Sequence, residues 1–409
     1  MIDRLYNYLV NRKPNIYQKY RTHRKGRRGL GIIGSWFYLL RLNIMDAISK
    51  GQESDEQAEG RSIRFKEQPE GLEARRETVE QLFWQCEEFD VISFDVFDTL
   101  LFRGVNEPSD AFYYIEEKLG YPNLGVLRRE MEGRAYRLKK QNASSNEVTL
   151  EYIWQLIEKE MGIESSHGIE IELEIEKEVC FANPYMVELL KKLKEKKKRI
   201  IAISDMYLSE GQIRTLLTES GIPDVFEEFF VSSEHGASKH DGRLFDIVKR
   251  KMGQELSYFH IGDNEHADVK QGKKHGFNVY HYLNVNDVGA PYREVSLSIP
   301  EGSAYNGLVN AYIHNGLEQY SKEYELGFIY GGPLALYCRK HGVNDDFQSN
   351  QMVKLLLESE KGEYVQGVED FSLYYMEKMK GRENIREKDI LRIIKGLEKY
   401  KDKVIRMMS

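Results

Sequence analysis

The chain has 409 residues, of which 41% are hydrophobic and 31% charged, and its formal net charge at pH 7 is −7. This length allows two or three domains with their own cores, and the acidic balance argues against general nucleic-acid binding. Three scattered cysteines without metal-ligand spacing predict a reducing, cytoplasmic compartment and no zinc site. No apolar run reaches the roughly 18 residues that a membrane-spanning helix needs.

The first 48 residues carry a different charge pattern. Residues 1–28 are strongly basic, with Asp3 as their one acid, and residues 30–48 place Trp36 and other apolar side chains at helical spacing. Such an extension is able to lie on an anionic surface, and peripheral attachment to the inner membrane surface is one interpretation. The other, which we favour slightly, is a helix that packs its apolar stripe onto the protein body.

Residues 51–76 are polar and predict a linker, and 77–87 predict a short helix that leads into the first strand. Residues 91–101, Val-Ile-Ser-Phe-Asp-Val-Phe-Asp-Thr-Leu-Leu, form an apolar run interrupted by Asp95 and Asp98. The run predicts a buried parallel strand that delivers a carboxylate to the edge of the sheet where open α/β folds place their chemistry. Two acids so close together favour a bound cation.

The pattern after Leu101 is helical and predicts an insertion between the first strand and the rest of the sheet. Thr149 is the expected N-cap of one helix, and 169–182 predict an exposed helix. Asn183 and Pro184 are the expected cap and first turn of another helix, 186–194.

From Arg199 onward, strands alternate with helices, which predicts a parallel sheet with right-handed crossovers. The expected strands are 200–204, 229–232, 258–262 and 278–282, and the expected helices are 209–220, 243–252 and 267–275. Residues 295–342 are rich in glycine and tyrosine and predict helical packing with tight turns. The charged tail after Asp345 favours helix.

Polar side chains follow three of these later strands. They are Ser204, Lys239 and the acidic pair Asp263 and Asp268. Together with Asp95 they suit phosphoryl transfer: a carboxylate attacks phosphorus, and a hydroxyl and a lysine neutralise the phosphoryl oxygens. Mg²⁺, which binds one or two carboxylates together with substrate phosphate, is the expected cofactor.

These residues make the sequence resemble the haloacid dehalogenase (HAD) superfamily, whose four motifs occur in order within about 88–285. The resemblance implies an α/β fold with a Rossmann-like parallel sheet core, 86–104 and 191–290, and an inserted α-helical C1 cap, 105–190. The N-terminal extension with its linker, 1–85, and a mostly helical region, 291–409, flank this core. A small phosphorylated metabolite is the implied substrate.

The resemblance also implies roles for individual residues. Asp95 matches the nucleophile, Ser204 and Lys239 match the phosphate-stabilising pair, and Asp263 and Asp268 match the acidic fourth motif. The expected metal ligands are Asp95, the Phe97 carbonyl, Asp263 and Asp268, the last as a direct ligand or as support. The expected phosphate-binding residues are Thr99, Ser204, Asp205 and Lys239.

More narrowly, the amino-acid sequences of these motifs are similar to those of a bacterial group of HAD hydrolases associated with surface polysaccharide synthesis and glycosyltransferases. This resemblance implies a sugar or nucleotide phosphate as substrate. It also implies a glycosyltransferase complex as a partner that residues 1–48 could contact.

The sequence departs from the superfamily at Phe97, where its phosphatases usually carry an aspartate that protonates the leaving group. Losing such an acid costs on the order of 10²–10⁴ in rate unless the leaving group is already good. Asp98 is one residue later and is either catalytic or a structural cap of the turn. A catalytically weak scaffold in a polysaccharide enzyme complex is therefore the alternative to a phosphohydrolase. The Gly262-Asp263-Asn264 metal motif disfavours a dehalogenase.

Overall fold

The structure is a computed structural model, and it describes residues 77–105, 107–142, 147–283 and 362–378, together with Leu39 and scattered positions between 303 and 332. The basic extension, the linker 51–76 and most of the tail after Asp345 lie outside the described residues. Contact of residues 1–48 with a membrane or a glycosyltransferase complex therefore stays a prediction. Within the described part, no helix is long and apolar enough to cross a membrane.

The chain forms two compact units. Among the described residues, the first unit holds Ser109–Glu178 and Met206–Ser209, and we call it the helical unit. The second, the sheet unit, holds the rest of the described chain beyond residue 76.

The sheet unit is built on five parallel strands in the order β5-β4-β1-β6-β7. The strands are rich in β-branched and aromatic residues and are mostly buried, as expected for a parallel sheet covered on both faces. The chain runs outward from β1 in both directions, so the switch point of the topology lies beside Asp95. The predicted α/β fold is thus confirmed, with strands β1 Val91–Phe94, β4 Arg199–Ser204, β5 Glu228–Val231, β6 Tyr258–Gly262 and β7 Asn278–His281.

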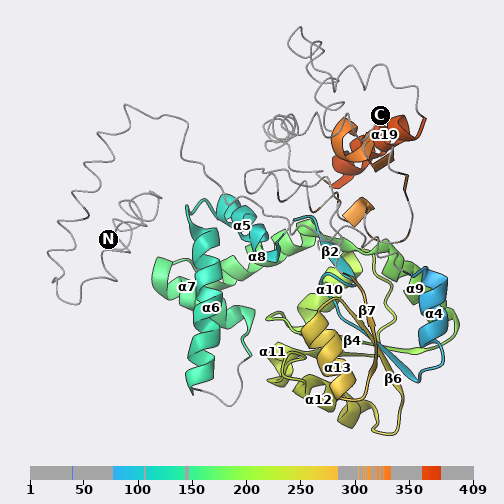
Figure 1. Cartoon of the computed structure of the whole chain (residues 1–409). Helices are drawn as coiled ribbons and strands as arrows, with labels where there is room; N and C mark the ends of the chain where they lie inside the picture. Colours follow the sequence, from blue (N-terminus) through green and yellow to red (C-terminus); the bar gives the residue numbers. More distant parts are fainter. Residues whose placement is uncertain are drawn as a thin grey trace. The chain divides into compact units, whose positions relative to one another are not determined.

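Figure 1 shows this sheet between α12 and α13 on one side and α4 and α9 on the other. The predicted helix starts are confirmed where caps define them. Asn183 accepts a hydrogen bond from the Tyr185 amide with Pro184 in the first turn, and Thr78 forms a capping box with Gln81. The helical segments are α4 Val79–Cys86, α9 Pro184–Glu195, α10 Glu210–Glu219, α11 Ser232–His235, α12 Arg243–Met252, η3 Glu265–Lys270 and α13 Gln271–Lys274.

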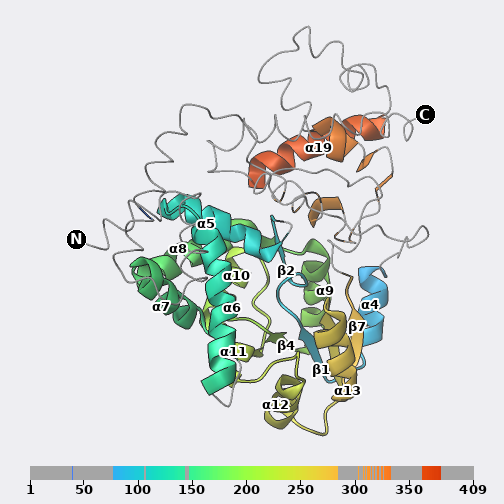
Figure 2. The same ribbon diagram turned by 60° about the vertical axis from the view of Figure 1, so that its left-hand side comes forward.

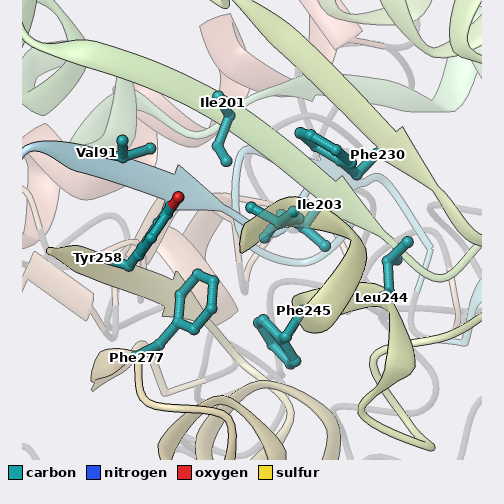
Figure 3. Packing of buried hydrophobic residues seen from close by; sticks show 9 residues of the cluster. Val91, Ile201, Ile203, Phe230, Leu244, Phe245, Tyr258 and Phe277 are labelled. Atoms are coloured by element: carbon teal, nitrogen blue, oxygen red, sulfur yellow. The ribbon is translucent and has the colours of Figure 1, made fainter. Parts of the chain in front are cut away.

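One face of the sheet packs its apolar side chains against α12. Figure 3 shows Ile203 and Tyr258 of the sheet close to Leu244, Phe245 and Phe277, all of them buried. The alternation of strand side chains puts Val91 and Ser93 on this same face. Ser93 is thus a polar residue within a mostly apolar layer.

Two short strands were not predicted. β2 (Leu101–Arg103) pairs antiparallel with β3 (Cys180–Ala182), and the helical insertion lies between them in the chain. The prediction of a helix over 169–182 is therefore wrong at its end, since the helix stops at Val179. Strands of three residues are too short to show a period of two, so their pairing partner decides the conformation.

The helical unit is made of η2 Pro108–Asp110, α5 Ala111–Leu119, α6 Leu124–Asn142, α7 Leu150–Met161 and α8 Ser165–Val179. Figure 2 shows α6 as the long helix with α5 and α7 beside it. Thr149 caps α7 as predicted, accepting from the Tyr152 amide. The prediction of an exposed α8 is wrong, because Glu172 and Glu176 are buried. Glu172 faces the buried Arg128 of α6, which supplies the counter-charge that the pattern of alternating charges does not reveal.

The described part of the C-terminal region has η4 (Gly327–Gly331) packed on α19 (Gly362–Lys378). A Cβ atom at Gly327 would lie 2.1 Å from the Tyr364 carbonyl oxygen, so only glycine permits this close approach. Phe328 stacks on Tyr312, with ring centroids 4.4 Å apart. The predicted role of these glycines and tyrosines in helical packing is confirmed for the described positions.

Candidate active site

The strand ends of the sheet unit bring a lysine and three carboxylates together. Asp95 directly follows β1, Asp263 directly follows β6, and Asp268 lies in η3. Carboxylate oxygens of these three residues lie within 4.8 Å of one another. The Lys239 ammonium lies 2.5 Å from Asp95 Oδ1 and 2.6 Å from Asp268 Oδ1. The structure thus gathers four of the residues that the sequence singled out into one cluster.

Burial makes the charges of this cluster strongly dependent on one another. Lys239 is 2% exposed and Asp268 is 1% exposed. Burial raises the pKa of the Asp95 carboxyl above its usual range, and Lys239 opposes this effect. Burial would lower the pKa of Lys239, but Asp268 and Asp95 together raise it above its ordinary value. The lysine therefore stays a cation, and it is a fixed positive charge beside the Asp95 carboxyl.

Asp268 is held by three groups of the protein. Besides Lys239, its Oδ1 lies 3.0 Å from His260 Nε2, and its Oδ2 accepts from the Asn264 amide at 2.9 Å. Burial would raise the pKa of Asp268, but Lys239 and His260 hold it below its usual range. Gly262 leaves room for this carboxylate, because a Cβ atom there would lie 2.4 Å from Asp268 Cγ.

The donor set fits Mg²⁺. Three carboxylates at a sheet edge supply the hard oxygen ligands that Mg²⁺ prefers, and the ion normally uses one or two of them. Both oxygens of Asp268 already accept hydrogen bonds from the protein. Asp95 and Asp263 are therefore the carboxylates best suited to bind the ion, with Asp268 in support. The predicted contribution of the Phe97 carbonyl stays a prediction.

Ser204 ends strand β4, and Asp205 directly follows it. Ser204 is the last residue of the strand and is buried. Asp205 Oδ1 accepts from the Lys239 amide at 2.6 Å, and its Oδ2 accepts from the His240 amide at 3.0 Å. The predicted phosphate-binding residue Asp205 thus binds the backbone of the loop that carries Lys239. A carboxylate in this position fixes the loop and would repel a phosphate.

The turn after β1 holds the remaining predicted residues. Thr99 is buried, and its hydroxyl has no hydrogen-bond partner among the described residues. Asp98 has a φ of 62°, in the left-handed region that glycine favours, and its amide donates to the Leu101 carbonyl at 2.7 Å. This backbone geometry is that of a structural turn residue.

Phe97 is covered by a cation. The Arg103 guanidinium carbon lies 4.2 Å from the centroid of the Phe97 ring, and Arg103 is buried. This cation–π contact stabilises the turn but offers no acidic proton. The phenylalanine that replaces the usual phosphatase aspartate is therefore packed against Arg103 in this turn.

Two buried polar residues at the site were missed by the sequence analysis. Ser93 on β1 and His260 on β6 are neighbours in the sheet register, and Ser93 Oγ lies 2.9 Å from His260 Nδ1. A signal existed, since each is a polar residue inside a short apolar strand. Such a residue must find a partner when buried.

Residues 89–276 match the model of a protein family described as haloacid dehalogenase-like hydrolase. A hydrolase of Schizosaccharomyces pombe, described as uncharacterized, is 29% identical to this chain over 103 residues. The match covers 24% of this chain and 44% of that protein, so the chain spans less than half the length of this curated relative.

Two solved structures are similar to about half of the chain. One is YfnB from Bacillus subtilis, described as a HAD hydrolase bound to magnesium, with a TM-score of 0.35 and 19% identity over 47% of this chain and 87% of that one. The other is the HAD family enzyme BT-2542 from Bacteroides thetaiotaomicron with magnesium and inorganic phosphate. Its TM-score is 0.36, with 18% identity over 48% of this chain and 95% of that one.

The family match covers strands β1, β4, β5 and β6 of the parallel sheet and the strand-end cluster. Residues 89–276, a little less than half of the chain, are thus similar to haloacid dehalogenase-like hydrolases.

Proposed function

We propose that the chain is an Mg²⁺-dependent phosphohydrolase that acts through an aspartyl-phosphate on Asp95. One observation carries this proposal: the Lys239 ammonium lies 2.5 Å from Asp95 Oδ1, within a cluster of three carboxylates at the carboxyl edge of a parallel sheet. A buried carboxylate beside a fixed cation is suited to attack phosphorus, because the cation neutralises the charge of the incoming phosphate.

The reaction has two steps. A carboxylate oxygen of Asp95 attacks phosphorus and the P–O bond to the leaving group breaks, so that the leaving group departs as an anion and takes any proton it needs from solvent water. Water then attacks phosphorus, the Asp95–phosphate bond breaks, and inorganic phosphate leaves with Asp95 restored as a carboxylate. Lys239 and Ser204 stabilise the negative charge on the phosphoryl oxygens in both steps. Mg²⁺ held by Asp95 and Asp263 supplies further positive charge when bound.

Phe97 limits the class of substrate. Its ring, packed under Arg103, cannot donate the proton that the leaving oxygen needs. The favoured substrates are therefore those whose leaving group is already stable as an anion, such as another phosphate. A sugar or nucleotide phosphate used in polysaccharide assembly is the substrate that the motif resemblance supports.

The proposal predicts hydrolysis that needs both Mg²⁺ and Asp95. A panel of phosphorylated metabolites is assayed for phosphate release with Mg²⁺ and with a chelator, and Asp95→Asn should abolish turnover while the melting temperature is retained. Asp90→Asn is the matched control, because Asp90 is an exposed carboxylate at the opposite end of β1. Release of phosphate by Asp95→Asn at the wild-type rate would refute the proposal. No hydrolysis of any substrate by the wild type would favour the scaffold alternative.

Asp98 is expected to be dispensable for proton transfer. Asparagine tolerates the same left-handed backbone conformation, so Asp98→Asn removes the acidic proton and keeps the turn. We expect kcat to fall by less than about tenfold, well short of the 10²–10⁴ that a lost general acid costs. A larger loss, with a flattened acidic or basic limb of the pH–rate profile, would instead make Asp98 the missing acid.

A further inference from the structure

A chain of buried polar side chains leads from the middle of the sheet to Lys239. It runs from Ser93 through His260 and Asp268 to the Lys239 ammonium, with contacts of 2.9, 3.0 and 2.6 Å. Ser93 and His260 are 0% exposed. Their position on the face that packs on α12 keeps water away from them. The Phe245 ring lies edge-on to the His260 ring, with the ring centroids 5.3 Å apart.

One proton of this chain can be assigned from its geometry. Because Asp268 is a carboxylate and only accepts, His260 Nε2 carries a proton and donates it to Asp268 Oδ1. Ser93 Oγ lies 2.9 Å from the other ring nitrogen, Nδ1, and 3.3 Å from the Phe259 carbonyl oxygen.

Asp268 connects the histidine with the lysine. The same oxygen, Oδ1, meets both His260 Nε2 and the Lys239 ammonium, while Oδ2 is fixed by the Asn264 amide. Two fixed donors leave the carboxylate one orientation. The ammonium, which bridges this carboxylate and Asp95, is thereby fixed as well.

We propose that His260, supported by Ser93, is a positioning residue for Lys239: through Asp268 it holds the ammonium against Asp95. This inference rests on the proposed function and deepens it. Neither residue touches the reacting atoms. They act as outer partners that orient a charged group, a role whose removal typically costs about 10–100-fold in activity.

Two amide substitutions separate this role from mere packing. In His260→Gln the amide nitrogen takes approximately the place of Nε2 and still donates to Asp268. In His260→Asn the amide reaches only as far as Nδ1 and Ser93. We expect kcat of His260→Asn to fall by about 10–100-fold with KM little changed, and kcat of His260→Gln to stay within about fivefold of wild type. A purely structural role would affect the two variants alike.

A second measurement does not depend on turnover. The rate at which acetic anhydride labels Lys239, followed by peptide mass spectrometry, reports how firmly the ammonium is held. We expect labelling several-fold faster in His260→Asn than in wild type or His260→Gln, with Lys198 as the internal control at unchanged rate. If the wild type hydrolyses nothing, the proposed function fails, and the labelling pattern still decides the positioning role.

Ser93→Ala tests the same inference if the amide side chains of His260→Asn and His260→Gln prevent folding. This variant removes one hydroxyl from a buried site, and we expect kcat to fall by about three- to tenfold with unchanged KM and faster labelling of Lys239. Equal behaviour of the Asn and Gln variants, or wild-type labelling of Lys239 in Ser93→Ala and His260→Asn, would overturn the inference.

Discussion

Replacing Lys239 with methionine should lower kcat by about 10²–10³-fold, the usual cost of losing one fixed donor to the transition-state charge. The same change should reduce the free energy of unfolding by about 3–5 kcal/mol. The reason is electrostatic: methionine fills a similar volume, but Asp95 and Asp268 would then lie buried together without their shared cation. Phosphate release and denaturant unfolding measure the two effects.

A second substitution separates stability from catalysis. In Lys239→Met/Asp268→Asn one of the two uncompensated charges is removed, so part of the lost free energy of unfolding should return while kcat stays low. Lys251→Met is the control, because Lys251 pairs with Glu228 at the exposed end of β5. Exposed pairs contribute about 0–1 kcal/mol. If Lys239→Met is as stable as Lys251→Met and as active as wild type, Lys239 is not the central cation of the site.

The fold of the sheet unit could be predicted from sequence because its signals are local. Strands β1, β4 and β6 are short apolar runs, and Asp95, Ser204 and Asp263 stand at or just beyond their ends. Parallel pairing then carries these ends to one edge whatever the details of packing. The helix starts at Thr149 and Asn183 could also be predicted, since a cap is recognised from a few neighbouring residues.

What the sequence did not reveal depends on partners far away in the chain. The sequence predicts Asp205 as a phosphate ligand because it does not show that the Lys239 and His240 amides donate to this carboxylate. Ser93 and His260 are separated by more than a hundred and sixty residues and meet only through sheet register. Glu172 looks like a solvated helix residue because its partner Arg128 lies on another helix. In each case a buried polar group is explained by one specific partner, and pattern alone does not supply it.

Replacing Arg128 with methionine should reduce the free energy of unfolding of the helical unit by about 3–5 kcal/mol, because it leaves the buried Glu172 carboxylate without its counter-charge. Arg128 is 0% exposed, and its Nε and one terminal nitrogen each donate to Glu172 at 2.7 Å. Its remaining terminal nitrogen donates to Glu132 at 2.9 Å, and Phe112 lies 4.5 Å from its guanidinium carbon. Denaturant unfolding measures the loss, and hydrogen exchange should localise it to α6, α7 and α8.

The helical unit provides its own control for this prediction. Lys118 pairs with Glu174 at 2.6 Å, a similar distance, but its side chain is 32% exposed. Lys118→Met should therefore cost only about 0–1 kcal/mol. In Arg128→Met/Glu172→Gln the uncompensated charge is gone and an acceptor for the Trp154 indole remains, so part of the stability should return. Equal losses for Arg128→Met and Lys118→Met would show that burial does not set the strength of the Arg128–Glu172 pair.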